Sequence, residues 1–280
     1  MAKRNRKLDI DKKIKNGQGL GQGSEYKPWI TIQDFPSNGR VSRIKGITSG
    51  RQHEFLSDLE SNYFYYLEFS DKVVDIREQF PLLPLEETIL IAKELGLKHP
   101  SHPQTKEPIV MTTDFLITIQ EPLGKGYEIV RTIKPKDMLM EERIIEKFEI
   151  EKIYFQKRNV DWGIVTDQEI DKEIANNLAD LFSYYNLSGL DGFSNMEIED
   201  IDDLEQAFIS KSVEYKGNLR TMCTRFDKDM SLIKGSGIAL LKHLIINKVI
   251  IIDITKKINL NEHITISINN KRCDEGAEIV

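Results

Sequence analysis

Two charged residues occupy positions where a folding chain rarely places charge. Asp114 lies inside the apolar segment TTDFLITI (112–119), and Lys134 ends the next extended segment, immediately before Pro135. Strand interiors disfavour aspartate, and a buried charge costs several kcal/mol unless it is paired. Either both groups reach solvent, or they neutralise each other, or something charged binds between them.

The spacing of the two segments predicts a β-hairpin that brings these residues together. If residues 121–125 form its loop, Asp114 and Thr132 face each other across the pair, because each lies six residues from the ends that meet at the turn. Side chains alternate along a strand, so Asp114, Thr132 and Lys134 are expected to share one face. A slip of one residue would reverse this relation.

A second carboxylate, that of Glu60, lies on the inward face of a predicted helix. Its neighbours at helical spacing are apolar: Leu56, Leu59, Tyr63, Phe64 and Leu67. A leucine would be expected at this place in the stripe. A salt bridge to a buried lysine, or a helix edge that reaches solvent, would explain Glu60 alone.

Together, the two carboxylates and the lysine suit metal-dependent phosphodiester chemistry. Glu60 and Asp114 would hold a divalent cation, and Mg²⁺ prefers such oxygen ligands while it keeps several waters. Lys134 would orient or deprotonate an attacking water, or stabilise charge that develops on a phosphate. An acid on a helix, then Asp, then x-x-Lys on the next strand is the order found in PD-(D/E)xK nucleases.

The elements that must position these residues follow in a regular order. A mixed sheet with helices packed on it is predicted for this part of the chain. The expected elements are a helix at 53–70, a strand at 73–83, a helix at 86–96, the hairpin within 111–137, a long amphipathic helix at 136–159 and a final buried strand at 161–167.

Beyond residues 167–171 helical patterns dominate, and a β-hairpin is expected at 249–269. Helices followed by a terminal hairpin indicate a winged-helix-like domain over 169–280, after a nuclease domain over 24–168. The acid-rich segment 196–205 within it is expected to form a solvated helix face or a docking face for a basic protein.

Charge is distributed unevenly along the chain. Residues 1–45 hold eleven Lys/Arg against four acids, a balance of +7, so the rest carries −13 within a total of −6. We expect residues 1–23 to form a basic flexible arm with a Gly-rich joint at 16–23. Its residues expected to bind DNA are Lys3, Arg4, Arg6, Lys7, Lys12, Lys13 and Lys15. A solvated, disordered tail is the alternative.

Other features of the sequence are consistent with a cytoplasmic protein. There is no apolar run of 18 residues and no hydrophobic core of a signal peptide near the N-terminus. The two cysteines, Cys223 and Cys273, lack metal-ligand spacing and are expected to be reduced thiols.

Several segments resemble one family, the TnsA endonuclease subunits of bacterial heteromeric transposases. The similarity is strong over about the first 170 residues and weak beyond them, and DIREQFPLLP (75–84) is its most specific part. The segments that carry it are KKIKNGQGLGQGSEYKPWITIQDFPSNGR, LSDLE, DIREQFPLLP, KHP, TDF, IKP and TDQEI.

The resemblance implies a restriction-endonuclease-like (PD-(D/E)xK) domain with Glu60, Asp114 and Lys134 as catalytic residues. Thr132 departs from the family, because this position is Glu in most such nucleases and Gln in TnsA proteins. A hydroxyl is a weaker metal ligand, so Glu60 and the backbone carbonyl of Ile133 are expected to compensate.

The resemblance also implies a reaction and partners. A TnsA-like subunit would use Mg²⁺, or Mn²⁺ in its place, to cut the 5′ strands at transposon ends. A DDE-type, TnsB-like transposase would cut and join the 3′ strands, and an AAA+, TnsC-like ATPase would regulate the assembly. Two alternatives are a non-catalytic DNA-binding adaptor with a degenerate nuclease fold and a free-standing restriction or repair nuclease.

Overall fold

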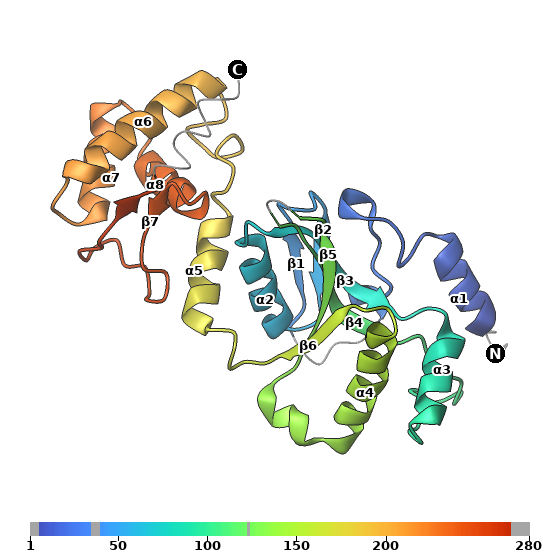
Figure 1. Cartoon of the computed structure of the whole chain (residues 1–280). Coiled ribbons are helices and arrows are strands. Elements are labelled where there is room, and N and C mark those ends of the chain that lie inside the picture. The colour runs from blue at the N-terminus through green and yellow to red at the C-terminus, as the bar shows by residue number, and fades with distance from the viewer. Residues whose placement is uncertain (1–5, 35–39, 122–123, 270–280) are drawn as a thin grey trace. The chain divides into compact units, whose positions relative to one another are not determined.

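The chain forms two compact units, Met1–Ile170 and Asp171–Val280, each with its own core. The computed structural model describes residues 6–34, 40–121 and 124–269. Figure 1 shows that the first unit is mixed α/β and the second mostly helical. No helix among the described residues is long and apolar enough to cross a membrane.

A four-stranded sheet forms the centre of the first unit. Its order is β3 (Val73–Pro81), β4 (Thr112–Ile119), β5 (Tyr127–Ile133) and β6 (Asp161–Val165). The first three strands are antiparallel, and β6 runs parallel to β5. In the β4–β5 hairpin Ile119 pairs with Tyr127 and Phe115 with Arg131, which is the predicted register.

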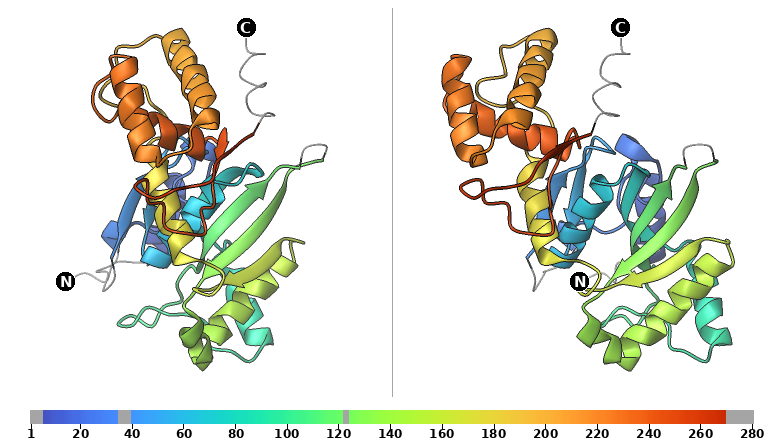
Figure 2. Two further views of the ribbon diagram at one scale, coloured as in Figure 1. Left: turned by 90° about the vertical axis from the view of Figure 1, so that its left-hand side faces the viewer. Right: turned by 60° about the vertical axis from the view of Figure 1, so that its left-hand side comes forward.

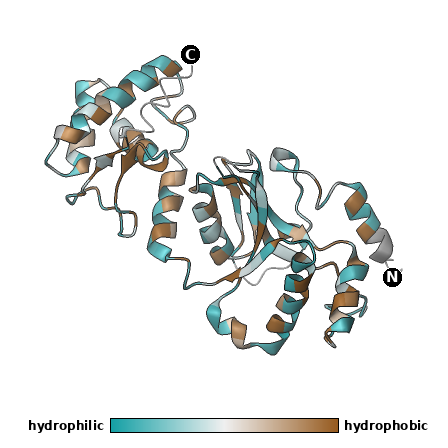
Figure 3. Ribbon diagram, viewed as in Figure 1, coloured by the Kyte–Doolittle hydropathy of each residue, from teal (hydrophilic) through white to brown (hydrophobic). Residues whose placement is uncertain are grey.

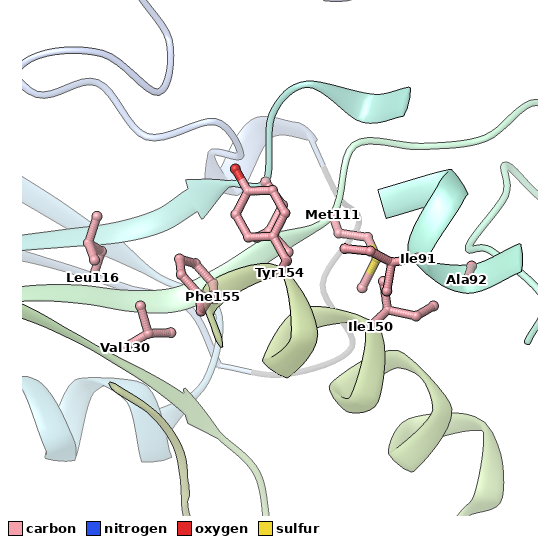
Figure 4. Close-up of a cluster of buried hydrophobic side chains, with 9 residues drawn as sticks. Ile91, Ala92, Met111, Leu116, Val130, Ile150, Tyr154 and Phe155 are labelled. Carbon is pink, nitrogen blue, oxygen red and sulfur yellow. The ribbon is translucent and has the colours of Figure 1, made fainter. Parts of the chain in front are cut away.

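Helices cover the two faces of this sheet. α2 (Asp58–Glu68) lies on one face, and α3 (Leu85–Glu94) and α4 (Glu142–Gln156) lie on the other (Figures 1 and 2). Aromatic rings from three elements meet on the α2 side: Phe55, Phe64 and Phe115. On the α4 side, Leu116 and Val130 of the sheet join a buried cluster with Ile150, Tyr154 and Phe155 of α4 (Figure 4).

Two predicted boundaries and one predicted burial in this unit were wrong. The expected helix 53–70 begins only at Asp58, because Gln52–Phe55 forms strand β2 and pairs with β1 (Ser42–Lys45). A 3₁₀ turn, Lys136–Met140, precedes α4. The strand β6 is largely half-exposed rather than buried, because it lies at the edge of the described sheet and pairs there with β5 alone.

The N-terminal segment is also more ordered than the expected flexible arm and joint. Arg6–Lys15 forms helix α1, and the 3₁₀ turns Gly23–Glu25 and Ile32–Asp34 follow it. The Gly23 amide donates to the Asp75 side chain at 3.1 Å, and the Trp29 amide donates to the Gln79 carbonyl at 3.2 Å. These bonds hold the Gly-rich stretch and the residues after it against β3.

The second unit contains four helices among its described residues, followed by a pair of short strands. The helices are α5 (Lys172–Phe182), α6 (Ile198–Glu214), α7 (Leu219–Asp229) and α8 (Ser236–Ile246). Hydrophobic and hydrophilic residues alternate along them (Figure 3), and Phe208 and Phe226 meet edge to face in the core. The expected hairpin 249–269 is reduced to Ile250–Ile251 paired with Ser267–Ile268. The winged-helix-like assignment stays a prediction.

An ion network buried on β3 connects the sheet to the β1–β2 hairpin. Arg51 donates to Glu78 Oε1 at 2.8 Å, and His53 Nδ1 lies 2.8 Å from Glu78 Oε2. Burial raises the pKa of Glu78, but hydrogen bonds and charges from Arg51 and His53 outweigh it and lower this pKa to about 2. The ionised carboxylate therefore stabilises the fold at pH values above the ordinary range of a glutamate, and this contribution disappears as the pH falls towards 2.

We expect Glu78→Gln to destabilise the protein by about 3–5 kcal/mol at pH 7, because it leaves buried cations without their partner. The matched control is Glu121→Gln, which removes an exposed pair with Lys72 and should cost about 1 kcal/mol or less. Urea unfolding measures both. Equal destabilisation in the two variants would show that the network does not hold the hairpin to the sheet.

Candidate active site

Glu60 is fixed in the first turn of α2 by a reciprocal capping arrangement. Ser57 caps the helix, accepting from the Glu60 amide at 3.2 Å and donating to Glu60 Oε1 at 2.7 Å. The Leu56 amide donates to Glu60 Oε2 at 3.1 Å. The sequence Ser-Asp-Leu-Glu carries this capping signature, which helical periodicity alone does not reveal. Glu60 is buried, as predicted, and the cap determines where its carboxylate lies.

Asp114 lies at the end of the hairpin, just beyond the last β4–β5 pair. Its Oδ2 accepts from the Ile133 amide at 2.7 Å, and Gln79 Nε2 lies 3.4 Å from its Oδ1. The carboxylate thus occupies the place where a ladder hydrogen bond would otherwise form. This explains how a strand accommodates an aspartate near its start.

Lys134 follows directly on β5. Its amide donates to the Val165 carbonyl at 3.0 Å, which extends the β5–β6 pairing by one residue. Its charge acts on the carboxyls of both Glu60 and Asp114. The three residues predicted to be catalytic therefore lie near enough for the charge of Lys134 to act on both carboxyl groups.

The two carboxyl groups repel each other in a poorly solvated setting. Burial, and then the charge of Asp114, raise the pKa of Glu60 to about 7, although Ser57, Leu56 and Lys134 act against this. Burial also raises the pKa of Asp114, while the Ile133 amide and Lys134 act against it. A divalent cation between the two groups would relieve both effects.

Thr132, predicted to bind metal, does not join this pair. Its hydroxyl lies 3.2 Å from the hydroxyl of Thr113 and donates to Glu151 Oε1 at 2.5 Å. The hydroxyl is thus turned towards α4, and the predicted face shared by Asp114, Thr132 and Lys134 is wrong for Thr132. The pairing ends at Phe115 and Arg131, so strict alternation across the hairpin no longer applies beyond that point.

Glu151 is a residue of the site that the sequence analysis missed. It is buried on α4, and Trp162 Nε1 donates to its Oε1 at 2.9 Å. Burial raises its pKa to about 7; hydrogen bonds from Thr132 and Trp162 act against this, and the charge of Asp114 raises it further. The sequence pattern that could have identified Glu151 is the one that identified Glu60: an acidic residue among apolar residues at helical spacing.

Gln79 is the second missed residue. It is buried opposite Asp114 in β3 and has a φ of 48°, in the left-handed region that costs a non-glycine residue about 1–3 kcal/mol. Its amide lies between the Thr112 hydroxyl, at 3.1 Å, and Asp114. A strained backbone that places a side chain on a site carboxylate indicates that this contact matters.

The donors present suit a cation that keeps part of its water shell. Among the described residues no three His, Cys, Asp or Glu side chains converge in a way that would hold a metal ion. Glu60 and Asp114 supply two carboxylates, and the carbonyl of Ile133 stays a predicted third ligand. Mg²⁺ commonly binds through one or two carboxylates with water completing its shell, so the set fits it.

Comparisons with known proteins give two matches to family models. Residues 70–167 match the TnsA-like endonuclease N-terminal domain, and residues 169–254 match the TnsA endonuclease C-terminal domain. The chain is 42% identical over 186 residues to the transposon Tn7 transposition protein TnsA of Escherichia coli. This similarity covers 65% of the chain and 66% of that relative.

The raised pKa of Glu60 predicts how stability depends on pH without metal. A native pKa of about 7, against 4.5 ordinarily, means that the folded state holds the proton more tightly than the unfolded chain. Stability should therefore fall as the pH rises from 4.5 to about 7. Glu60→Gln should remove part of this slope and be more stable than wild type at pH 8 by about 1–2 kcal/mol.

Urea unfolding in a chelator from pH 4 to pH 8 measures this. Part of the slope should persist in the variant, because Glu151 has a similarly raised pKa. Mg²⁺ at pH 8 should stabilise the wild type and not Glu60→Gln. Identical slopes in the two proteins would exclude Glu60 as the titrating group.

Proposed function

The chain belongs to the family of TnsA-like endonucleases, and on that premise we propose that it is a metal-dependent DNA endonuclease of a transposase complex. It would cut the 5′ strands at transposon ends by hydrolysis. The observation that supports this most is the convergence of Glu60, Asp114 and Lys134 at the end of the β4–β5 hairpin.

Each of these residues has a part in the proposed chemistry. Glu60 and Asp114 would hold Mg²⁺, or Mn²⁺ in its place, and the cation supplies charge neutralisation and an acidic bound water. Lys134 would orient that water or donate to the phosphate oxygen on which charge develops. The Ile133 amide and Gln79 keep the Asp114 carboxylate in position. The products would be a 5′-phosphate and a 3′-hydroxyl.

One observation favours a second candidate, a DNA-binding adaptor that does not cut. The Thr132 hydroxyl is engaged by Glu151, so the position that supplies Glu or Gln in related nucleases offers no oxygen to a metal beside Asp114. A free-standing restriction or repair nuclease shares the proposed chemistry but would need no partner subunits.

The proposed partners act on the same DNA. A DDE-type, TnsB-like transposase would process the 3′ strands, because a single metal site per subunit suits cutting of one strand. A TnsC-like AAA+ ATPase would license the assembly in the bacterial cytoplasm. The second unit, proposed to be winged-helix-like, would bind the ATPase or DNA, and α6 begins with exposed acids, Glu199, Asp200, Asp202 and Asp203.

The first test is removal of site residues from the full chain in the presence of the partner proteins. Asp114→Ala should abolish 5′-strand cleavage, and Lys134→Ala should slow it about 10²–10⁴-fold, because each acts on the reacting groups. Strand-specific cleavage of end-labelled transposon DNA with Mg²⁺ measures both. Asp58→Ala, which removes an exposed acid of α2, is the control.

Three outcomes separate the candidates. Wild-type nicking by Asp114→Ala would refute the site. Tight DNA binding without cleavage at any Mg²⁺ or Mn²⁺ concentration would favour the adaptor. Sequence-specific double-strand cutting by the isolated chain would favour a restriction enzyme.

The basic N-terminal segment is proposed to contact DNA phosphates. Lys12 and Lys15 are exposed on α1, whereas Lys13 donates to the Trp29 carbonyl at 2.7 Å and lies 3.5 Å from Asp34. Lys3 and Arg4 lie outside the described residues, and Arg6 and Lys7 begin α1. Lys13 therefore has partners within the protein, and Lys12 and Lys15 are the better candidates.

Replacing both Lys12 and Lys15 by Gln should weaken binding to DNA of any sequence. The slope of log affinity against log salt should fall by about 0.9 for each phosphate that the protein no longer neutralises. Titrations of a fluorescent duplex at several salt concentrations measure the slope. An unchanged slope would assign α1 to another role, such as protein docking.

A further inference from the structure

One face of α4 carries two cations and the buried Glu151 at a spacing of four residues. Arg143, Lys147 and Glu151 are each separated by four positions, so they lie in one row along the helix. Glu151 fixes where this row points, because it accepts the hydrogen bond from Thr132 of β5. The row therefore faces the end of β5.

The direction of α4 then determines which residues meet further along. Later residues of α4, Tyr154 and Phe155, cluster with the earlier β5 residue Val130 (Figure 4), so the helix runs antiparallel to β5. Lys134 lies about 6.6 Å beyond Thr132 along the strand, and Lys147 lies about 6 Å before Glu151 along the helix. Because the two elements are antiparallel, both displacements point in the same direction. Lys147 is thereby brought towards Lys134.

The electrostatics agree with this placement. Partial loss of solvation lowers the pKa of Lys147, and the charges of Arg143 and Lys134 lower it further, while the charge of Glu141 acts against them. In the described part of the chain the ammonium groups of Lys134 and Lys147 have no carboxylate within ion-pair distance. Arg143 pairs, among the residues that the structure describes, only with Glu146 of its own helix, at 2.5 Å.

This gathering of cations is unfavourable for the free protein. Arg143 lies in the first turn of α4, where the helix dipole disfavours positive charge. The charge of Lys134 adds to the repulsion at Lys147. A negative ligand beside Lys147 would remove the repulsion, and the exposed position of Lys147 allows such a ligand to reach it.

We infer that Lys147 and Arg143 form a binding site for a DNA backbone phosphate adjacent to the one that Lys134 meets. The inference rests on the proposed function and adds a second, metal-independent phosphate contact to it. The ligand is a phosphodiester oxyanion of duplex DNA, which Lys147 binds as a point charge and Arg143 through its planar fork. This contact would fix the register of the strand relative to the carboxylate pair.

The test measures DNA affinity in a chelator, so that binding is separated from cleavage. Full-length wild type, Lys147→Gln and Lys147→Arg are titrated with a fluorescent DNA duplex at several salt concentrations. Lys147→Gln should bind about 3–10-fold more weakly and lower the salt slope by about 0.9. Lys147→Arg should bind like the wild type.

Lys152→Gln is the matched control, because Lys152 lies on the same helix but close to Glu149, at 3.5 Å. It should leave affinity unchanged. The thermal midpoint of Lys147→Gln should be equal to or above that of the wild type, since the substitution removes like-charge repulsion. Inorganic phosphate at millimolar concentration should compete weakly, which distinguishes a duplex site from a site for free phosphate.

Each outcome is decisive. If Lys147→Gln matches both wild type and Lys152→Gln in affinity and slope, the phosphate site is refuted while the proposed nuclease stands. Full competition by inorganic phosphate at micromolar concentration would refute a DNA site in favour of a small-anion site. If the wild type binds no DNA with or without its partners, the proposed function fails, and the inference fails with it.

Discussion

The first unit depends on an energetically unfavourable arrangement, in which two carboxyl groups lie close together and away from water. Burial raises the pKa of both Glu60 and Asp114, and the charge of Asp114 raises that of Glu60 further. The fold offsets this cost with backbone amides, since Leu56 donates to Glu60 and Ile133 donates to Asp114. Neither group can be satisfied without a helix start and a hairpin end at this place. The positions of α2 and of the β4–β5 pair are therefore tied to the requirements of the site.

The segment DIREQFPLLP, the most specific part of the resemblance in sequence, mainly supports the site and contributes little to its chemistry. Within DIREQFPLLP, Asp75 and Arg77 form a buried ion pair, and Glu78 holds Arg51 and His53. The contacts of Glu78 join the β1–β2 hairpin to β3, and the Gly23 amide, which donates to Asp75, joins the N-terminal segment to it. The strand β2 leads directly into the cap of α2. Only Gln79 of this motif reaches the site carboxylate among the described contacts. The residues of a specific sequence match can thus hold a site in place without taking part in its chemistry.

The sequence predicted those features that depend on local pattern. Alternation and loop length were enough to give the hairpin register, and a charge inside an apolar pattern identified Asp114 and Glu60. Features fixed by distant contacts were missed. In the sequence, residues 52–55 look like the start of the helix that follows them. They form a strand because they pair with β1. The Gly-rich stretch is held against β3 by the hydrogen bond from the Gly23 amide to Asp75. Thr132 turns away because Glu151, nineteen residues later, accepts its hydrogen bond.

The site has an acidic side and a basic side, and Lys134 lies between them. On one side are the carboxylates of Glu60 and Asp114, and on the other are the cations Lys147 and Arg143. A phosphodiester chain suits this arrangement, because one phosphate can lie by a metal held between the carboxylates while its neighbour lies by the cations. Without DNA and metal, burial and the charge of Asp114 disfavour the ionised form of Glu60, and the charges of Arg143 and Lys134 disfavour the ionised form of Lys147. Under the proposed function, a metal at the carboxylates and a phosphate at the cations would each bind the folded state and so raise its stability.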